Sequence, residues 1–185
     1  DTKIYDALQG SQEFAQRVVV DPSALAILAR GAVAAAGVAS VYLNYHLGRQ
    51  LFASHGIGLA AAFLLALNPI HVERSQWALN DIPTVLSIQL FLVACGLVGT
   101  RGHLRHYLLA GALVGLAVSF KYSAAFASPA LLAAHWAHSQ TSPLWKRFVH
   151  PRIGLAAAMA VLAFVAVTPF SVLAFPEFQR DLAYI

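Results

Sequence analysis

The stretch Ile82–Val98, IPTVLSIQLFLVACGLV, contains no charged residue and is bounded by Asp81 and Gly99. At about 1.5 Å per residue, a helix over this stretch would cross most of a hydrocarbon core that is about 30 Å thick. Five further apolar stretches accompany it: Ala24–Leu47, Gly56–Leu67, Tyr107–Phe120, Tyr122–Trp136 and Ile153–Thr168. The sequence therefore predicts an all-α fold, a polytopic bundle of about six transmembrane helices. Several stretches are shorter than the roughly 20 residues of a perpendicular span, so re-entrant segments remain an alternative.

The composition supports a membrane protein. Of the 185 residues, 59% are hydrophobic and 11% are charged, whereas soluble domains have roughly 45–50% apolar and 25% charged residues. The mean hydropathy is +0.66. These values exclude an ordinary soluble domain and a disordered chain. Cys95 is the only cysteine, so an internal disulfide is excluded as well.

The charges predict the orientation of the bundle. If all six stretches cross, the eight acidic residues lie on one side, together with both chain ends, the 68–81 loop and the junction at Lys121. The three opposite loops contain six basic residues and no acidic one: Arg49, Arg101, Arg105, Lys146, Arg147 and Arg152. By the positive-inside rule the opposite loops are cytoplasmic, and the acidic side is extracytoplasmic. We therefore expect a multi-pass protein of the inner (plasma) membrane.

The same topology predicts the domain organisation. Residues 1–23 are expected to be the end of an extracytoplasmic loop, 24–175 a transmembrane helical domain, and 176–185 the start of an extracytoplasmic segment. The chain begins with Asp1 and shows no signal peptide. Because an outside N-terminus needs an upstream segment to export it, we expect a fragment that lacks at least one transmembrane helix.

The 68–81 loop contains most of the polar residues at the outer side. Asp81, followed by Ile82-Pro83, predicts a helix N-cap with proline in the first turn. Thr, Ser or Asn would cap as well without bringing a charge to a membrane boundary, so a functional carboxylate is the alternative. His71, Glu73 and Arg74 fit either an interfacial ion-pair cluster or groups that bind a substrate.

Two further basic residues are candidates for a binding role, and one glycine pattern is a candidate for helix packing. Lys121 can extend to the interface, or it can provide a point charge for a phosphate. Arg30 lies within the first stretch, so it either faces a protein interior or extends outward. Gly111-Ala-Leu-Val-Gly115 is a small-xxx-small pattern typical of closely packed helices.

Several function classes lack their motifs. The sequence has no P-loop, no dinucleotide fingerprint, no HExxH and no zinc-finger spacing, and nothing predicts a nucleic-acid partner. No cofactor is certain, although His71 and Glu73 could join a divalent metal site. A transporter or channel subunit is the main alternative to an enzyme, and a noncatalytic scaffold is the second. Transporters usually have polar residues near the bilayer midplane, whereas the charged candidate site residues, apart from Arg30, gather at one face, which favours an interfacial enzyme.

Three segments in this order resemble one family. They are LLALNPIHVERSQWALNDIPTVLSIQLFLVA (64–94), YLLAGALVGLAVSFKYSAAFASPALLAAH (107–135) and TPFSVLAFPEFQRDLAYI (168–185). Together they are similar to the membrane core of the GT-C glycosyltransferases, and most of all to the branch of the protein O-mannosyltransferases and the lipid A aminoarabinose transferases. The resemblance covers about residues 24–185.

The resemblance implies an integral membrane enzyme with its site on the extracytoplasmic face. Such an enzyme moves a sugar from a polyprenyl-phosphate donor to a lipid, glycan or protein acceptor, with inversion at the anomeric carbon. The acidic pair of the family lies in a loop upstream of this chain. Asp81 matches a second acidic position, which implies a supporting acid/base role, and Lys121 matches a basic residue at a helix junction. The outer loops supply further candidates: Arg74 and His71 for the donor phosphate, and Glu73 and Tyr122 for the cavity.

Overall fold

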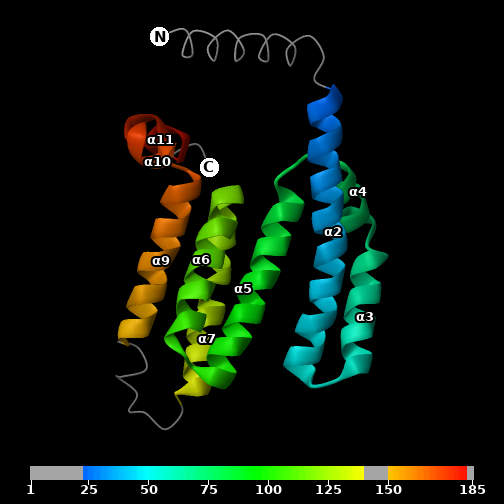
Figure 1. The fold of residues 1–185 in the computed structure, drawn as a ribbon, viewed down its shortest axis with the longest axis vertical. Coiled ribbons are helices and arrows are strands. Elements are labelled where there is room, and N and C mark those ends of the chain that lie inside the picture. Colours follow the sequence, from blue (N-terminus) through cyan, green and yellow to red (C-terminus); the bar gives the residue numbers. More distant parts are fainter. Residues whose placement is uncertain (1–22, 140–149, 183–185) are drawn as a thin grey trace, which may run out of the picture.

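The computed structural model describes residues 23–139 and 150–182, and every regular element within them is helical. The elements are α2 (Ser23–Phe52), α3 (His55–Ala66), α4 (Pro69–Gln76), α5 (Asp81–Arg101), α6 (Leu104–Phe120), the 3₁₀-helix η1 (Tyr122–Ala127), α7 (Pro129–His138), α9 (Pro151–Val167), α10 (Phe170–Leu173) and α11 (Phe175–Leu182). Figure 1 shows the longer helices side by side, with α4, α10 and α11 at the upper end. The predicted all-α class is confirmed for these residues.

Helix α5 connects the two halves of the bundle. It packs against α2 on one side and against α6 and α7 on the other, while α3 packs on α2 and α9 packs on α6. Successive helices run in opposite directions, so the start of α5 and the end of α6 lie at the same, upper end (Figure 1). This arrangement places the 68–81 segment beside the junction at Lys121.

The number of membrane crossings stays a prediction. In the part of the chain that the structure describes, α2 and α5 are long and apolar enough to cross a membrane. The pair α3 and α4 would form a third span if helices bent by 59° at their break count as one. Helices α6 and α9 are apolar, but each has only 17 residues. The structure thus supports a helical membrane protein and leaves the six spans unconfirmed.

The expected single span over Tyr122–Trp136 is interrupted. A 3₁₀-helix covers Tyr122–Ala127, and a separate ten-residue helix, α7, begins at Pro129. Proline has no backbone N–H to donate and fits the first turn of a helix, so it begins a helix more readily than it continues one. The stretch thus consists of two short helical segments, and its membrane crossing stays a prediction.

The glycine pattern in α6 is a packing contact. A Cβ atom on Gly111 would clash with the backbone carbonyl of Ala156 in α9, and one on Gly115 would clash with that of Ala160. Because both glycines lack a side chain, the backbones of α6 and α9 approach closely. The packing predicted from Gly111 and Gly115 is confirmed.

The core lies where α5, α6, α7 and α9 meet. Phe91, Val98 and Tyr107 are fully buried there, and Cys95 is a buried free thiol. The hydroxyl of Tyr107 shares a hydrogen bond of 2.6 Å with Nδ1 of His135, which is 2% exposed. This polar pair crosses from α6 to α7 and fixes the two helices relative to each other.

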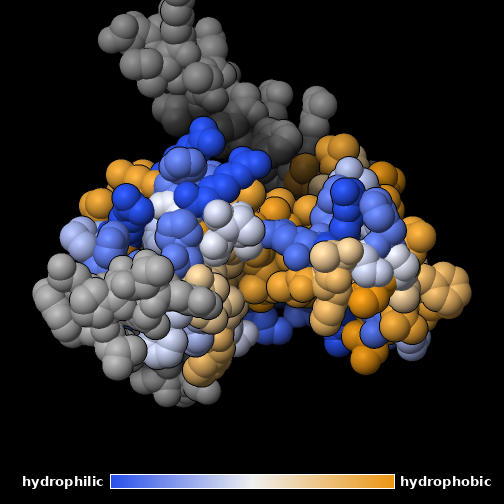
Figure 2. All heavy atoms as spheres, turned by 90° about the horizontal axis from the view of Figure 1, so that it is seen from below, coloured by the Kyte–Doolittle hydropathy of each residue, from blue (hydrophilic) through white to orange (hydrophobic). Residues whose placement is uncertain are grey.

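Among the described residues, acidic side chains lie at the upper end of the bundle, where Arg74 and Lys121 also lie, whereas basic side chains lie at both ends. Glu73, Asp81 and Glu177 belong to elements at the upper end. Hydrophilic side chains also gather on the lower end (Figure 2), where Arg49 and Arg101 end their helices and Arg152 donates to the carbonyl of Gly102 at 2.7 Å. The acidic residues Asp1, Asp6, Glu13 and Asp21, and the basic residues Lys146 and Arg147, lie outside the described residues.

Candidate functional site

The site begins at the break between α3 and α4. Pro69 ends the apolar α3 and opens α4, and the side chain of Asn68 caps the new helix by accepting from the N–H groups of Ile70 (2.9 Å) and His71 (3.1 Å). The segment expected to be a loop is therefore helical over Pro69–Gln76. The bend directs α4 along the upper end of the bundle toward the start of α5.

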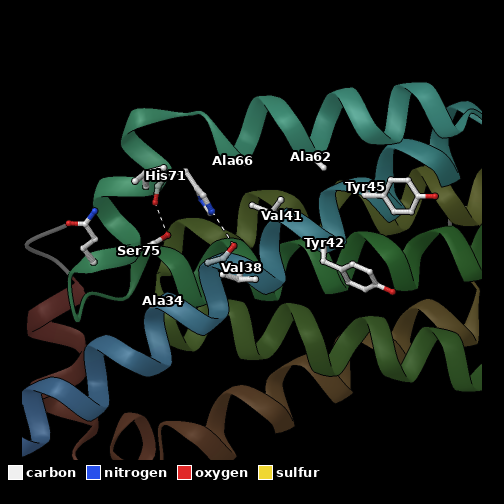
Figure 3. A pocket seen from close by; sticks show the side chains of 12 residues that line it. Ala34, Val38, Val41, Tyr42, Tyr45, Ala62, Ala66, His71 and Ser75 are labelled. Atoms are coloured by element: carbon white, nitrogen blue, oxygen red, sulfur yellow. Dashed lines mark hydrogen bonds between the residues drawn. The ribbon is translucent and has the colours of Figure 1, made fainter.

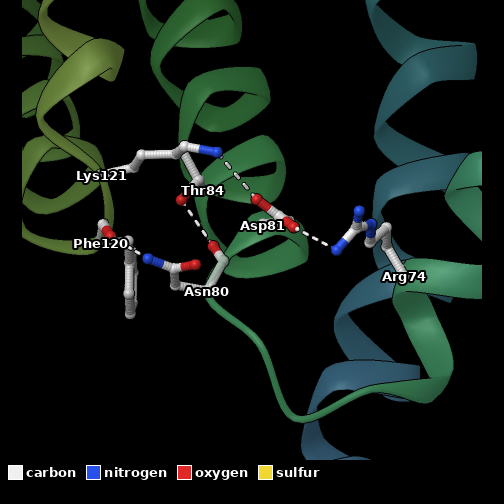
Figure 4. A network of polar contacts seen from close by, with 6 residues as sticks. All are labelled: Arg74, Asn80, Asp81, Thr84, Phe120 and Lys121. Carbon is white, nitrogen blue, oxygen red and sulfur yellow. Dashed lines mark hydrogen bonds and ion pairs between the residues drawn. The ribbon is translucent and has the colours of Figure 1, made fainter.

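Asp81 does not cap α5. Asn80 occupies the N-cap position, and Asp81 is the first residue of the helix. The prediction of an Asp81 cap is wrong, because the two carboxylate oxygens instead meet cations from other elements. Nζ of Lys121 donates to Oδ1 at 3.0 Å, and NH1 of Arg74 lies 3.4 Å from Oδ2. We call Arg74, Asp81 and Lys121 the outer triad (Figure 4).

The outer triad joins three elements and remains open to solvent. Arg74 comes from α4, Asp81 from α5, and Lys121 from the junction between α6 and η1. The side chains of Lys121 and Arg74 are 52% and 45% exposed, and that of Asp81 is 29% exposed. Ion pairs this exposed typically contribute about 0–1 kcal/mol to stability. The structure brings the 68–81 segment and Lys121 to the same end of the bundle, as their predicted shared side requires, and the exposed ion pairs themselves add little to stability.

A second bond holds the same two elements together. The side-chain amide of Asn80 donates to the backbone carbonyl of Phe120 at 2.7 Å, and the hydroxyl of Thr84 donates to the carbonyl of Asn80 at 2.6 Å (Figure 4). Asn80 directly precedes Asp81, and Phe120 directly precedes Lys121. The bond from Asn80 therefore sets the register in which Asp81 meets Lys121. Asn80 was not among the site residues predicted from the sequence, although its position next to Asp81 could have indicated it.

His71 faces away from the outer triad. Its Nε2 lies 3.2 Å from the carbonyl of Gly37 in α2, and the hydroxyl of Ser75 donates to the carbonyl of His71 at 2.7 Å (Figure 3). His71 and Ser75 line a cavity of about 680 Å³ between α2, α3 and α4, and apolar side chains form most of its remaining wall. The structure does not bring His71 to Lys121.

The ion-pair cluster expected from His71, Glu73 and Arg74 does not form. Arg74 pairs with Asp81, and Glu73 has no salt bridge among the described residues. Within residues 23–139 and 150–182, no three His, Cys, Asp or Glu side chains lie close enough to hold a metal ion. A divalent site that includes His71 and Glu73 stays a prediction.

Arg30 is placed by an aromatic ring. Its guanidinium lies 5.8 Å from the centre of the Trp77 ring, at the end of α4. A cation over a tryptophan face is stabilised by the ring's electrostatic field. Arg30 thus extends toward the upper end of the bundle, as one of its two predicted orientations requires. Its contact with Trp77 also connects α2 to the 68–81 segment.

Tyr122 borders a second cavity beside the outer triad. This cavity has about 390 Å³ and is lined by Asn80 together with residues 118–123. The Tyr122 ring lies 6.3 Å from that of Phe164 in α9 and 6.1 Å from that of Phe178 in α11. Lys121 lines the cavity and also belongs to the outer triad.

The donors of the outer triad are only partly used. A lysine ammonium has three donors and an arginine guanidinium has five. Lys121 uses one on Asp81, and Arg74 makes one ion pair to the same carboxylate. The remaining donors can bind an anionic ligand, and a phosphate has the oxygens to accept from both.

A family model described as dolichyl-phosphate-mannose-protein mannosyltransferase matches residues 22–173. The chain belongs to this family. The match contains every member of the outer triad and the cavity next to it. Membership supports a membrane-bound glycosyltransferase of the GT-C type. No curated protein and no solved structure matches the chain.

Proposed function

We propose that the protein transfers a sugar from a polyprenyl-phosphate donor to an acceptor hydroxyl at the extracytoplasmic face of the inner membrane, with inversion. One observation carries the proposal: a mannosyltransferase-family chain brings Arg74, Asp81 and Lys121 from three separate elements to one open site. Family membership supports the reaction class. The outer location is supported by Glu73, Asp81 and Glu177, which all belong to elements at the end of the bundle that holds the outer triad.

The reaction needs a carboxylate as base, an acceptor hydroxyl and cations at the leaving phosphate. A carboxylate takes the proton of the acceptor hydroxyl, and the acceptor oxygen forms a bond to the anomeric carbon of the sugar. The bond from that carbon to the phosphate oxygen breaks, and its electron pair leaves with the polyprenyl phosphate. Attack from the face opposite the leaving phosphate inverts the anomeric carbon. Cations at the phosphate stabilise the charge that develops on the leaving oxygen.

Lys121 and Arg74 are the proposed phosphate ligands. Both lie within 3.4 Å of one carboxylate and keep further donors free of that contact. Because Asp81 holds the two cations near each other, a phosphate can bind to both without a rearrangement of the helices. This arrangement pre-orients positive charge where the leaving group departs.

Asp81 has the proposed supporting acid/base role. In the structure both of its oxygens face cations, so it also positions Lys121 and Arg74. Each carboxylate oxygen has two lone-pair sites, so Asp81 can keep both cations in place and still accept a proton from an acceptor hydroxyl. Under this proposal the family's upstream acidic residues supply the principal base.

The test is transfer from a polyprenyl-phosphate sugar in membranes that contain the full-length protein, normalised to folded protein. We expect product that depends on the lipid-linked donor and that has the inverted anomeric configuration. Retention of configuration, or the absence of transfer with every lipid-linked sugar offered, would contradict the proposal. A matched acid-to-amide control, Glu177→Gln, changes a carboxylate whose nearest cation is Arg180 in the same helix, at 3.9 Å. This variant should keep wild-type transfer.

A further inference from the structure

The cavity beside Lys121 has the size of a small-ligand site. Its volume of about 390 Å³ lies in the range of pockets that bind small molecules. It lies where α5 begins and α6 ends, and it includes Lys121 of the outer triad. A ligand in this cavity would therefore adjoin a phosphate bound to Lys121.

The wall of the cavity is mostly neutral and has unused polar groups. Lys121 is its one charged lining residue. The hydroxyl of Ser123 has no hydrogen bond to any other described residue, whereas that of Ser119 donates to the carbonyl of Gly115 at 3.0 Å and can still accept. Asn80 adds an amide oxygen, because its NH₂ group donates to the carbonyl of Phe120.

An aromatic residue adds an apolar surface to these polar groups. Tyr122 lines the cavity and is 38% exposed, while Phe164 and Phe178 hold its ring in place. A pyranose has an apolar face of C–H groups and an edge of hydroxyls. Neutral hydroxyl and amide groups next to an exposed ring match both surfaces, whereas the cavity at His71 has an almost entirely apolar wall.

We propose that this cavity holds the pyranose ring of the donor, with Ser123 bonded to a ring hydroxyl and Tyr122 against the ring face. This inference rests on the proposed function and adds which residues select the sugar. The anomeric carbon then lies beside Lys121, so the phosphate at Lys121 and the sugar in the cavity belong to one donor molecule.

The experiment measures kcat and KM of the full-length protein in membranes with two donors. The donors share one lipid phosphate and differ at one ring hydroxyl. Ser123→Ala should raise KM for the preferred donor about 5- to 10-fold, the loss expected for one hydrogen bond, and should reduce discrimination between the two sugars. Tyr122→Ala should raise KM for both donors. Binding of sugar-free polyprenyl phosphate should not change in either variant.

A matched control and a second variant separate this inference from folding. Ser139→Ala removes a serine hydroxyl at the other end of the bundle, which donates to the carbonyl of His135 at 2.8 Å, and should match wild type. Ser123→Thr keeps the hydroxyl and should recover part of the selectivity. Unchanged KM and unchanged discrimination in Ser123→Ala and Tyr122→Ala would overturn the sugar site. If Lys121→Ala still lost transfer in that case, the proposed function would stand.

Discussion

The two polar contacts at opposite ends of the bundle differ in what surrounds them. At the upper end, Asp81 meets Lys121 at 3.0 Å in the open, next to a cavity. Toward the lower end, Tyr107 and His135 share a 2.6 Å hydrogen bond with almost no exposure. Buried polar groups are costly to leave unpaired, whereas exposed ion pairs contribute little to stability. The difference indicates that the buried pair contributes more to the stability of the fold than the outer triad does, in keeping with the ligand-binding role proposed for the triad.

The largest effect is expected at Asp81. Asp81→Asn keeps the shape of the side chain and removes its charge, so it should reduce transfer by about 10²- to 10⁴-fold, the usual cost of losing acid/base catalysis. The thermal midpoint of the purified protein should stay close to that of wild type, because the ion pairs are exposed. Rate per folded protein, measured with Glu177→Gln as control, checks both statements. Wild-type turnover in Asp81→Asn would remove Asp81 from the site.

The second largest loss of transfer is expected at Lys121. Lys121→Ala removes a cation from the proposed phosphate site and should reduce transfer about 100-fold, as the loss of one electrostatic stabiliser does. Lys121→Arg should recover only part of the rate, since a planar guanidinium does not reproduce a compact ammonium. Arg49→Ala is the matched control, because it removes a cation at the lower end of the bundle and should keep full transfer. Full rescue by arginine would show that charge alone matters there.

A substitution where α6 packs on α9 should reduce the amount of folded protein rather than the rate of transfer. Gly111→Val places a side chain against the backbone of Ala156, and overpacking of this type typically costs about 1–3 kcal/mol or more. Folded protein in the membrane should fall, while the rate per folded molecule stays near wild type. Gly154→Val is a suitable control, because nothing lies within 4 Å of a Cβ atom at that glycine. Equal losses in both variants would contradict the close contact.

The smallest effect is expected at the buried pair. Tyr107→Phe removes the hydroxyl and leaves Nδ1 of His135 without its partner, which should reduce stability by about 1–3 kcal/mol. Transfer per folded protein should not change, because the pair contacts no part of the outer triad. Thermal unfolding in detergent measures the first effect, and the membrane assay measures the second. A large loss of turnover without loss of stability would break the comparison between the two ends.

The sequence predicted the fold class and the meeting of distant segments better than it predicted local geometry. An apolar stretch in a bilayer satisfies its backbone hydrogen bonds by forming a helix, and the alternating direction of successive helices places Asp81 and Lys121 at the same end of the bundle. The exact ends of helices depend on which of several neighbouring residues takes the cap position and on where proline stands. Asn80 took the N-cap that Asp81 was expected to take, and Pro129 divided a stretch whose apolar composition suggested one helix.

The direction of side chains around α4 could not be predicted either. His71 and Arg74 lie three positions apart, yet one faces Gly37 in α2 and the other faces Asp81 in α5. The reason is the 59° bend before Pro69, because it sets which face of α4 meets α2. Composition and charge do not encode that angle. The pairing of Tyr107 with His135 was not predicted either, because it depends on how α6 packs against α7.

The most direct test of the account is a double-mutant cycle of Asp81→Asn and Lys121→Ala, measured as transfer per folded protein. If the two side chains form one site, each single change already disrupts the same unit. The double variant should then be no more than about 3-fold slower than the slower single variant, because residues that act together are non-additive. If the two losses multiply in full, Asp81 and Lys121 act independently, and the account of one outer site is contradicted.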